Sequence, residues 1–183
     1  AGIKIFGNYS RGLPQKSLSL FARGKYGNGS FDYPFFEDKS IQDFEAFILR
    51  NSGNDWNSSM FRDALLHQLI MDLDIDYLAY RPAVVYLNGD YWGIHNIREK
   101  INEHYLAGNH NVDPDNLDLL ELNGQVIEGN ASDYQQLISF LTTADLTDPA
   151  NYDQVKRAMD IDSYCQYVIT QFFGVNTDWP GNN

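Results

Sequence analysis

Apolar residues alternate with polar ones, or form short dense runs, in the first part of the chain. Residues 2–6 and 16–23 show this strand-like pattern, and a Ser-Arg-Gly-Leu-Pro turn separates them, so we predict a hairpin-like pair of strands. Residues 44–50 are predicted to form another strand. Apolar residues spaced three and four apart then predict a helix over about residues 60–73, capped by Ser58 or Ser59.

A second hairpin is predicted around Asn88-Gly89, because this dipeptide separates apolar runs at residues 83–87 and 90–97. A short helix is expected at 98–106 and a strand at 117–122, with a polar loop near 109–116 between them. Helical spacing returns at residues 132–141, 152–158 and 161–174.

This order of elements, strands first and helices later, indicates an α+β fold. We predict a sheet-rich N-terminal lobe at about residues 1–106 and a helical C-terminal lobe at about residues 107–183. Protein kinases have this general arrangement of lobes.

The negative charge of the chain limits the kinds of molecule that it is expected to bind. The chain has 13 Lys and Arg against 25 Asp and Glu, a formal charge of −12, which argues against binding nucleic acid or an anionic membrane surface. No apolar run is long enough to predict a membrane span. The one cysteine, Cys165, lies in a segment with helical spacing and is expected to be buried.

The final eight residues, Asn-Thr-Asp-Trp-Pro-Gly-Asn-Asn, place Asp178 five positions before Asn183. Catalytic loops of protein kinases use this spacing: the aspartate accepts the proton of the acceptor hydroxyl, and the asparagine holds a magnesium ion. No His-Arg precedes Asp178 here. The spacing makes Asp178 a candidate catalytic residue and Asn183 a candidate metal ligand.

Four other residues are candidates for the nucleotide site. Lys16 precedes a predicted strand behind a turn rich in small residues and could contact phosphates, although a solvated strand lysine would give the same pattern. Glu99 could pair with Lys16 or a bound cation, or simply be a solvated carboxylate in the first turn of a helix. Arg50 and Arg62 could clamp phosphate, or pair with neighbouring carboxylates.

Other chemistries find less support. The four histidines are scattered, and no Gly-x-Ser-x-Gly sequence is present, so neither a zinc site nor serine-based acyl transfer is expected. A group of aromatic residues could instead form a sugar- or peptide-binding platform, but packing in the core is their more frequent use and is expected here. The residues concerned are Tyr86, Tyr91, Trp92, Tyr105 and Trp179.

Several of these segments together resemble the CotH (spore-coat protein H) kinase family. The Leu-Asn-Gly-Asp-Tyr-Trp-Gly sequence at residues 87–93 and the Asp-Trp-Pro-Gly-Asn-Asn sequence at 178–183 are the most specific. Shorter matches in family order accompany them: Asn-Tyr-Ser-Arg at 8–11, Pro-Gln-Lys at 14–16, Leu-Arg-Asn at 49–51 with Asp55 and Arg62-Asp63, and Asn-Ile-Arg-Glu at 96–99.

The resemblance implies an atypical protein-kinase-like fold that binds ATP with Mg²⁺ or Mn²⁺ and phosphorylates Ser or Thr of exported or spore-coat proteins. It implies a location outside the cell, on its surface or in the spore coat. It also implies a further metal-binding aspartate downstream of residue 183, so we expect the 183 residues to be a truncated kinase domain with negligible activity of its own. The alternative is a non-catalytic surface or structural module that binds protein or glycan.

Overall fold

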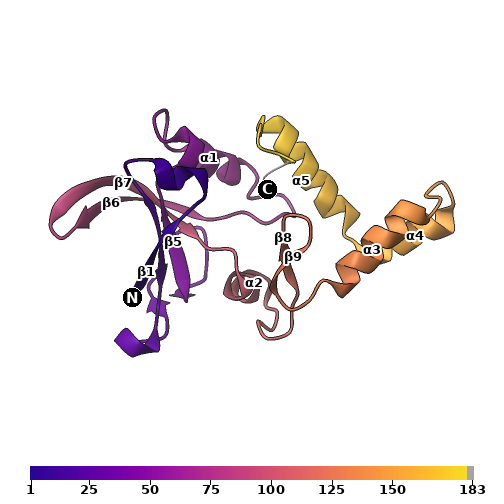
Figure 1. Ribbon diagram of the computed structural model, residues 1–183, viewed down its shortest axis with the longest axis horizontal. Helices are drawn as coiled ribbons and strands as arrows, with labels where there is room; N and C mark the ends of the chain where they lie inside the picture. The colour runs from indigo at the N-terminus through magenta and orange to yellow at the C-terminus, as the bar shows by residue number, and fades with distance from the viewer. Residues whose placement is uncertain (181–183) are drawn as a thin grey trace. The chain divides into compact units, whose positions relative to one another are not determined.

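The computed structural model describes residues 1–180, which divide into two compact units. Unit 1 comprises residues 1–71 and 76–111, and unit 2 comprises residues 72–75 and those from 112 onward. Unit 1 is built on a five-stranded antiparallel sheet (Figure 1). Its strands, in spatial order, are β1 (Gly2–Phe6), β2 (Ser17–Phe21), β5 (Ala46–Arg50), β7 (Asp90–Glu99) and β6 (Tyr80–Leu87).

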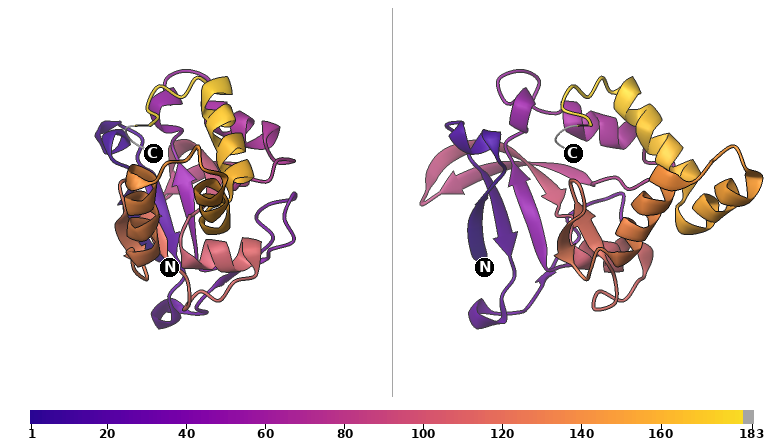
Figure 2. Two further views of the ribbon diagram at one scale, coloured as in Figure 1. Left: turned by 90° about the vertical axis from the view of Figure 1, so that its right-hand side faces the viewer. Right: turned by 45° about the vertical axis from the view of Figure 1, so that its right-hand side comes forward.

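Both predicted hairpins are confirmed. Strands β1 and β2 pair antiparallel, with Ile3 opposite Leu20. Strands β6 and β7 pair along their whole length and project past the neighbouring strands of the sheet (Figure 2). Asn88 and Gly89 form their turn with φ of 53° and 92°, the left-handed conformation that a two-residue hairpin turn needs.

One face of the sheet carries the aromatic core of unit 1. Two short strands, β3 (Phe31–Asp32) and β4 (Asp43–Phe44), form a separate pair beside it. Phe36 and Phe44 are buried together with Ala79, and Phe35 stacks on Phe47 of β5 with ring centroids 4.7 Å apart. Such close ring contacts stabilise the sheet beyond simple burial of area.

The helices of unit 1 differ from the sequence expectations at their ends. Helix α1 (Arg62–Leu69) is shorter than the predicted 60–73, and neither Ser58 nor Ser59 is its N-cap. The helix predicted at 98–106 is wrong, because β7 stays paired with β5 as far as Glu99. Helix α2 (Glu103–His110) begins only after Asn102, whose side chain caps it.

Unit 2 contains a small hairpin and three helices. The helices α3 (Ser132–Thr143), α4 (Pro149–Ala158) and α5 (Ile161–Phe173) confirm the three predicted ones. The strand predicted at 117–122 is β8 (Leu119–Glu121), and it pairs with β9 (Gln125–Glu128), which the sequence pattern did not indicate. Asp148 and Asp160 cap α4 and α5.

Cys165 is exposed, so the prediction of a buried thiol is wrong. Helix α5 has helical apolar spacing, yet none of its residues is buried, because no described segment covers its apolar side fully.

Residues 1–180 also contain three short 3-10 helices: η1 (Tyr9–Gly12), η2 (Gly24–Tyr26) and η3 (Gly53–Asp55). Within residues 1–180, no helix has the length and apolar character that crossing a membrane requires. The antiparallel sheet and the later helices agree with the predicted α+β class.

Candidate functional site

Two arginines from neighbouring strands meet at one carboxylate on the face of the sheet opposite the aromatic core. Arg50 ends β5, and Arg98 in β7 is the cross-strand partner of Ile48. Because side chains alternate along a strand, all three lie on one face. Asp63, in the first turn of α1, accepts a hydrogen bond from Arg98 Nη1 on its Oδ2 atom. The same oxygen lies 3.7 Å from Arg50 Nε.

His67 and the backbone of Leu78 complete this cluster, which we call the arginine site (Arg50, Asp63, His67 and Arg98). The N–H of Leu78 donates to His67 Nδ1 over 2.9 Å, and the carbonyl of Leu78 accepts from Arg98 Nη2 over 3.1 Å. Since Nδ1 is an acceptor, the proton of the neutral imidazole belongs on Nε2. That atom lies 3.7 Å from Asp63 Oδ1.

The arginine site carries a net positive charge. Burial alone would raise the pKa of Asp63, but Arg50 and Arg98 outweigh it and hold the pKa below its ordinary value. Burial, helped by Arg98, lowers the pKa of His67 to about 4, so His67 is neutral at pH 7. Two guanidinium groups therefore face one carboxylate in a chain whose formal charge is −12.

The hydrogen bonds of the two arginines are incomplete. The Nε atoms of Arg50 and Arg98 are buried without a hydrogen-bond partner within residues 1–180. Arg98 is almost fully buried, whereas the Arg50 side chain is 36% exposed. A cluster with a net positive charge, in which the Arg50 side chain is partly open to solvent, fits an oxyanion such as a phosphate group.

The loop between β5 and α1 is organised by a second carboxylate. Asp55 is buried and accepts hydrogen bonds from Ser59 Oγ over 2.6 Å and from the backbone N–H of Arg62 over 3.1 Å. Burial opposes ionisation, but these hydrogen bonds outweigh it and lower the pKa of Asp55. Asp55 thus takes over the capping that was predicted for a serine. The Arg62 guanidinium lies 3.5 Å from Asp55 and is mostly exposed.

Lys16 is used to shape the turn before β2. Its Nζ donates to the carbonyl oxygens of Arg11 and Leu13, both over 2.6 Å. The turn is also tied to the rest of unit 1, because His95 Nε2 lies 2.9 Å from the carbonyl oxygen of Lys16. The next residue back, Gln15, accepts from Trp56 Nε1 over 3.2 Å on its side chain.

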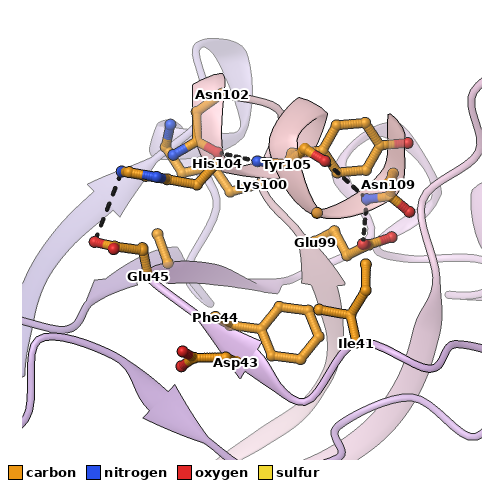
Figure 3. A pocket seen from close by; sticks show the side chains of 12 residues that line it. Ile41, Asp43, Phe44, Glu45, Glu99, Lys100, Asn102, His104, Tyr105 and Asn109 are labelled. Atoms are coloured by element: carbon orange, nitrogen blue, oxygen red, sulfur yellow. Dashed lines mark hydrogen bonds and ion pairs between the residues drawn. The ribbon is translucent and has the colours of Figure 1, made fainter. Parts of the chain in front are cut away.

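Glu99 pairs with Lys39 and not with Lys16. The Lys39 ammonium lies 2.8 Å from Glu99 Oε2, and both side chains are buried. Figure 3 shows Glu99 beside Asn109, whose amide donates to Oε1 over 3.1 Å. Glu99 also accepts from the backbone N–H of Ala79. It lies on a strand, not in the first turn of a helix as one interpretation of the sequence required.

The pocket beside Glu99 is small. It has a volume of about 50 Å³ and lies between the β4–β5 segment and α2, lined among others by Ile41, Phe44 and His104 (Figure 3). This is enough for ordered water but not for a nucleotide. Because Arg98 and Glu99 are neighbours in β7, they point to opposite faces, which separates this pocket from the arginine site.

In unit 2, Asp178 lies in the turn that follows α5 and is exposed. Its backbone N–H donates to Asn176 Oδ1 over 3.1 Å. Trp179 packs on Phe172 with ring centroids 5.5 Å apart, which holds this turn against the helix. Asn183 lies outside the described residues. Within residues 1–180, no group of three or more His, Cys, Asp or Glu side chains could hold a metal ion.

The predicted nucleotide residues are therefore not gathered in one place in unit 1. Arg50 belongs to the arginine site, Arg62 pairs with Asp55, Lys16 binds its own turn, and Glu99 pairs with Lys39.

Asp63 and Arg98 lie in segments that resemble the family, but neither residue was predicted to belong to a site, and Lys39 was not predicted at all. The signal for Asp63 was present: a strand ending in a cation, followed by a helix with a carboxylate in its first turn. No local pattern marked Lys39.

A comparison with protein families decides the family. The model of the CotH kinase protein family matches residues 3–183. The chain belongs to the CotH kinase family. The match covers nearly its whole length and confirms the resemblance that the sequence motifs indicated. No curated protein matches the chain. Membership in the CotH kinase family indicates a kinase-like function in general.

Proposed function

We propose that this CotH family member is part of a protein kinase that transfers phosphate from ATP to Ser or Thr hydroxyls of exported or coat proteins, outside the cell or on its surface. The observation that carries the proposal is the ion pair between Arg50 and Asp63. In protein kinases, a cation on the third strand of the sheet contacts the nucleotide phosphates and pairs with a carboxylate of the following helix.

Arg50 and Asp63 occupy positions comparable to those of this kinase ion pair. Arg50 ends the third strand in the spatial order of the sheet, and Asp63 opens α1, the next helix of the chain after this strand. In this proposal Arg50 contacts the phosphates and Asp63 orients it. The net positive charge of the arginine site and the partial exposure of the Arg50 side chain support an anionic ligand there.

The remaining residues take supporting roles. Lys16 fixes the turn between β1 and β2, and the buried Glu99–Lys39 pair fixes α2 to the sheet. Direct contacts of Lys16, Glu99 or Arg62 with a nucleotide stay predictions.

Asp178 is the proposed acceptor of the hydroxyl proton. Bound Mg²⁺ or Mn²⁺ would neutralise charge on the phosphates, with Asn183 as the proposed ligand. Asp178 is exposed in the turn that follows α5.

The test is phosphate transfer from radiolabelled ATP to a Ser- and Thr-containing protein substrate, using the longest natural protein that contains this chain. Arg50→Gln and Asp178→Asn should each lose most of the activity. Arg157→Gln, on the exposed face of α4, is the matched control and should keep it. Transfer at the control rate by both site variants would contradict the assignment.

One observation favours a second function, a non-catalytic module that binds glycan or peptide. Tyr86, Tyr91 and Trp92 are exposed on the β6–β7 hairpin, contrary to the expected burial, with the two tyrosine rings 5.8 Å apart. Tyr105 is buried and cannot contribute. A ligand that binds only the folded state raises its melting temperature. Mg·ATP should therefore raise the Tm of a kinase, and no shift in the intact protein would favour the binding module.

A further inference from the structure

In the arginine site, Asp63 interacts more closely with Arg98 than with Arg50. Arg98 is held at two points, since Nη1 donates to Asp63 and Nη2 to the carbonyl of Leu78. Within residues 1–180, the contact of Arg50 with this carboxylate is a 3.7 Å ion pair, through Nε, to the same oxygen. Asp63 is therefore hydrogen-bonded to the buried Arg98, whereas the more exposed Arg50 makes the longer ion pair.

This division has a chemical consequence for Arg50. A carboxylate facing a single arginine tends to form two parallel hydrogen bonds with the guanidinium, and so uses the donors that a phosphate would need. Here Oδ2 of Asp63 is already taken by Arg98, and Oδ1 faces His67 Nε2 at 3.7 Å. Asp63 can thus attract and orient Arg50 without enclosing it.

The backbone of Leu78 holds two side chains of the arginine site in place. Leu78 donates its N–H to His67 and accepts from Arg98 through its carbonyl, which fixes both side chains that flank Asp63. Arg98 is nearly inaccessible to solvent, so a ligand approaching the site would meet Arg50 first.

We propose that Arg98 is a positioning residue, which holds Asp63 so that the guanidinium of Arg50 stays available to a phosphate group. This rests on the proposed function of Arg50. Removal of Arg98 lets Asp63 pair fully with Arg50, and the phosphate site is lost although Arg50 itself is unchanged. Additional removal of the carboxylate frees Arg50 again.

The experiment measures binding of Mg·ATP, and of tripolyphosphate as a probe without adenine, by isothermal titration calorimetry on the intact protein. Arg98→Met should weaken binding of both probes by about tenfold, because Arg50 is captured. The double variant Arg98→Met with Asp63→Asn should bind more tightly than Arg98→Met alone, but it should recover only part of the loss because Asp63 no longer orients Arg50. A purely structural role of Arg98 predicts the reverse order, because a second member of the arginine site has been removed.

Circular dichroism establishes that each variant is folded. If Arg98→Met does not fold, Arg98→Lys serves instead: lysine keeps the charge but not both hydrogen bonds, so binding should weaken by about two- to fivefold. Arg157→Gln is the control and should bind as the natural protein does.

The outcomes separate the two ideas. If Arg50→Gln binds both probes normally, the proposed phosphate site is wrong. If Arg50→Gln loses binding but the double variant binds no better than Arg98→Met, or Arg98→Lys binds normally, only the role of Arg98 is overturned.

Discussion

The buried pair of Lys39 and Glu99 gives a prediction about stability. In Lys39→Met, Glu99 remains in the core without its cation, which typically costs about 3–5 kcal/mol of unfolding free energy. Both side chains are less than a tenth exposed, at 7% and 3%, so water replaces little of the lost interaction. Glu99 keeps its hydrogen bonds from Ala79 and Asn109, which places the expected loss at the lower end, about 3 kcal/mol.

The double variant Lys39→Met with Glu99→Gln removes both charges together. The glutamine oxygen can still accept from the N–H of Ala79, so the double variant should cost no more than about 1–2 kcal/mol. The two substitutions are therefore expected to be strongly non-additive, as groups in direct contact are.

Urea denaturation followed by tryptophan fluorescence measures these values. A Trp179→Phe background leaves Trp56 and Trp92, both in unit 1, so the signal reports the unit that contains the pair. Lys4→Met, on the exposed side of β1, is the matched control and should change stability by less than about 0.5 kcal/mol. The reasoning would be refuted if Lys39→Met lowered the unfolding free energy by less than about 1 kcal/mol. It would also be refuted if the double variant lost as much stability as the two single variants, Lys39→Met and Glu99→Gln, together.

Three further predictions concern single groups. Asp55→Ala should cost about 2–3 kcal/mol at pH 7 in the same urea assay, because three donors lose their acceptor. Folding lowers the pKa of Asp55 from 3.8, so the ionised carboxylate stabilises the fold above that pH, and this stabilisation is lost as the pH falls through the lower pKa of the folded state. If the stability difference between Asp55→Ala and the natural protein did not change with pH, ionisation of Asp55 would not be its cause. In the folded protein His67 is neutral down to about pH 4, whereas in the unfolded chain its imidazole gains a proton near pH 6.5. The free energy of unfolding should therefore fall by about 3 kcal/mol as the pH is lowered from 6.5 to 4. His67→Gln should lack that part of the pH dependence, and an unchanged profile would count against burial of the neutral ring. Cys165 should react with a thiol reagent in the native protein as fast as in urea, and protection without denaturant would show that it is covered.

Local patterns in the sequence were enough to predict the hairpins and most helices. Asn88-Gly89 determined a two-residue turn, and the helices of unit 2 followed from apolar spacing. The error at residues 98–106 has a tertiary cause: Glu99 is kept extended by pairing with Phe47, a strand partner distant in the sequence.

The candidate site was harder to predict for the same reason. Arg50 could be proposed from its position at the end of a strand, but its partner depends on how α1 lies against the sheet. One interpretation of Glu99 paired it with a cation, and in the structure that cation is Lys39 from the loop between β3 and β4. Lys16 was predicted either to contact phosphates or to be solvated, but it donates to two carbonyl oxygens in its own turn.

The anchoring of the turn before β2 also limits how its length can vary among related chains. Each residue from 15 to 17 makes a contact with another part of unit 1. The carbonyl of Gln15 accepts a hydrogen bond from the Asn51 side chain, and Ser17 Oγ donates one to it. The carbonyl oxygen of Lys16 lies beside His95 Nε2. An inserted residue there would shift β2 against β5 by one position and exchange the buried serines, Ser17 and Ser19, with the buried Leu18 between the two faces of the strand. Insertions and deletions should therefore be tolerated only before Arg11, at the tip of the turn.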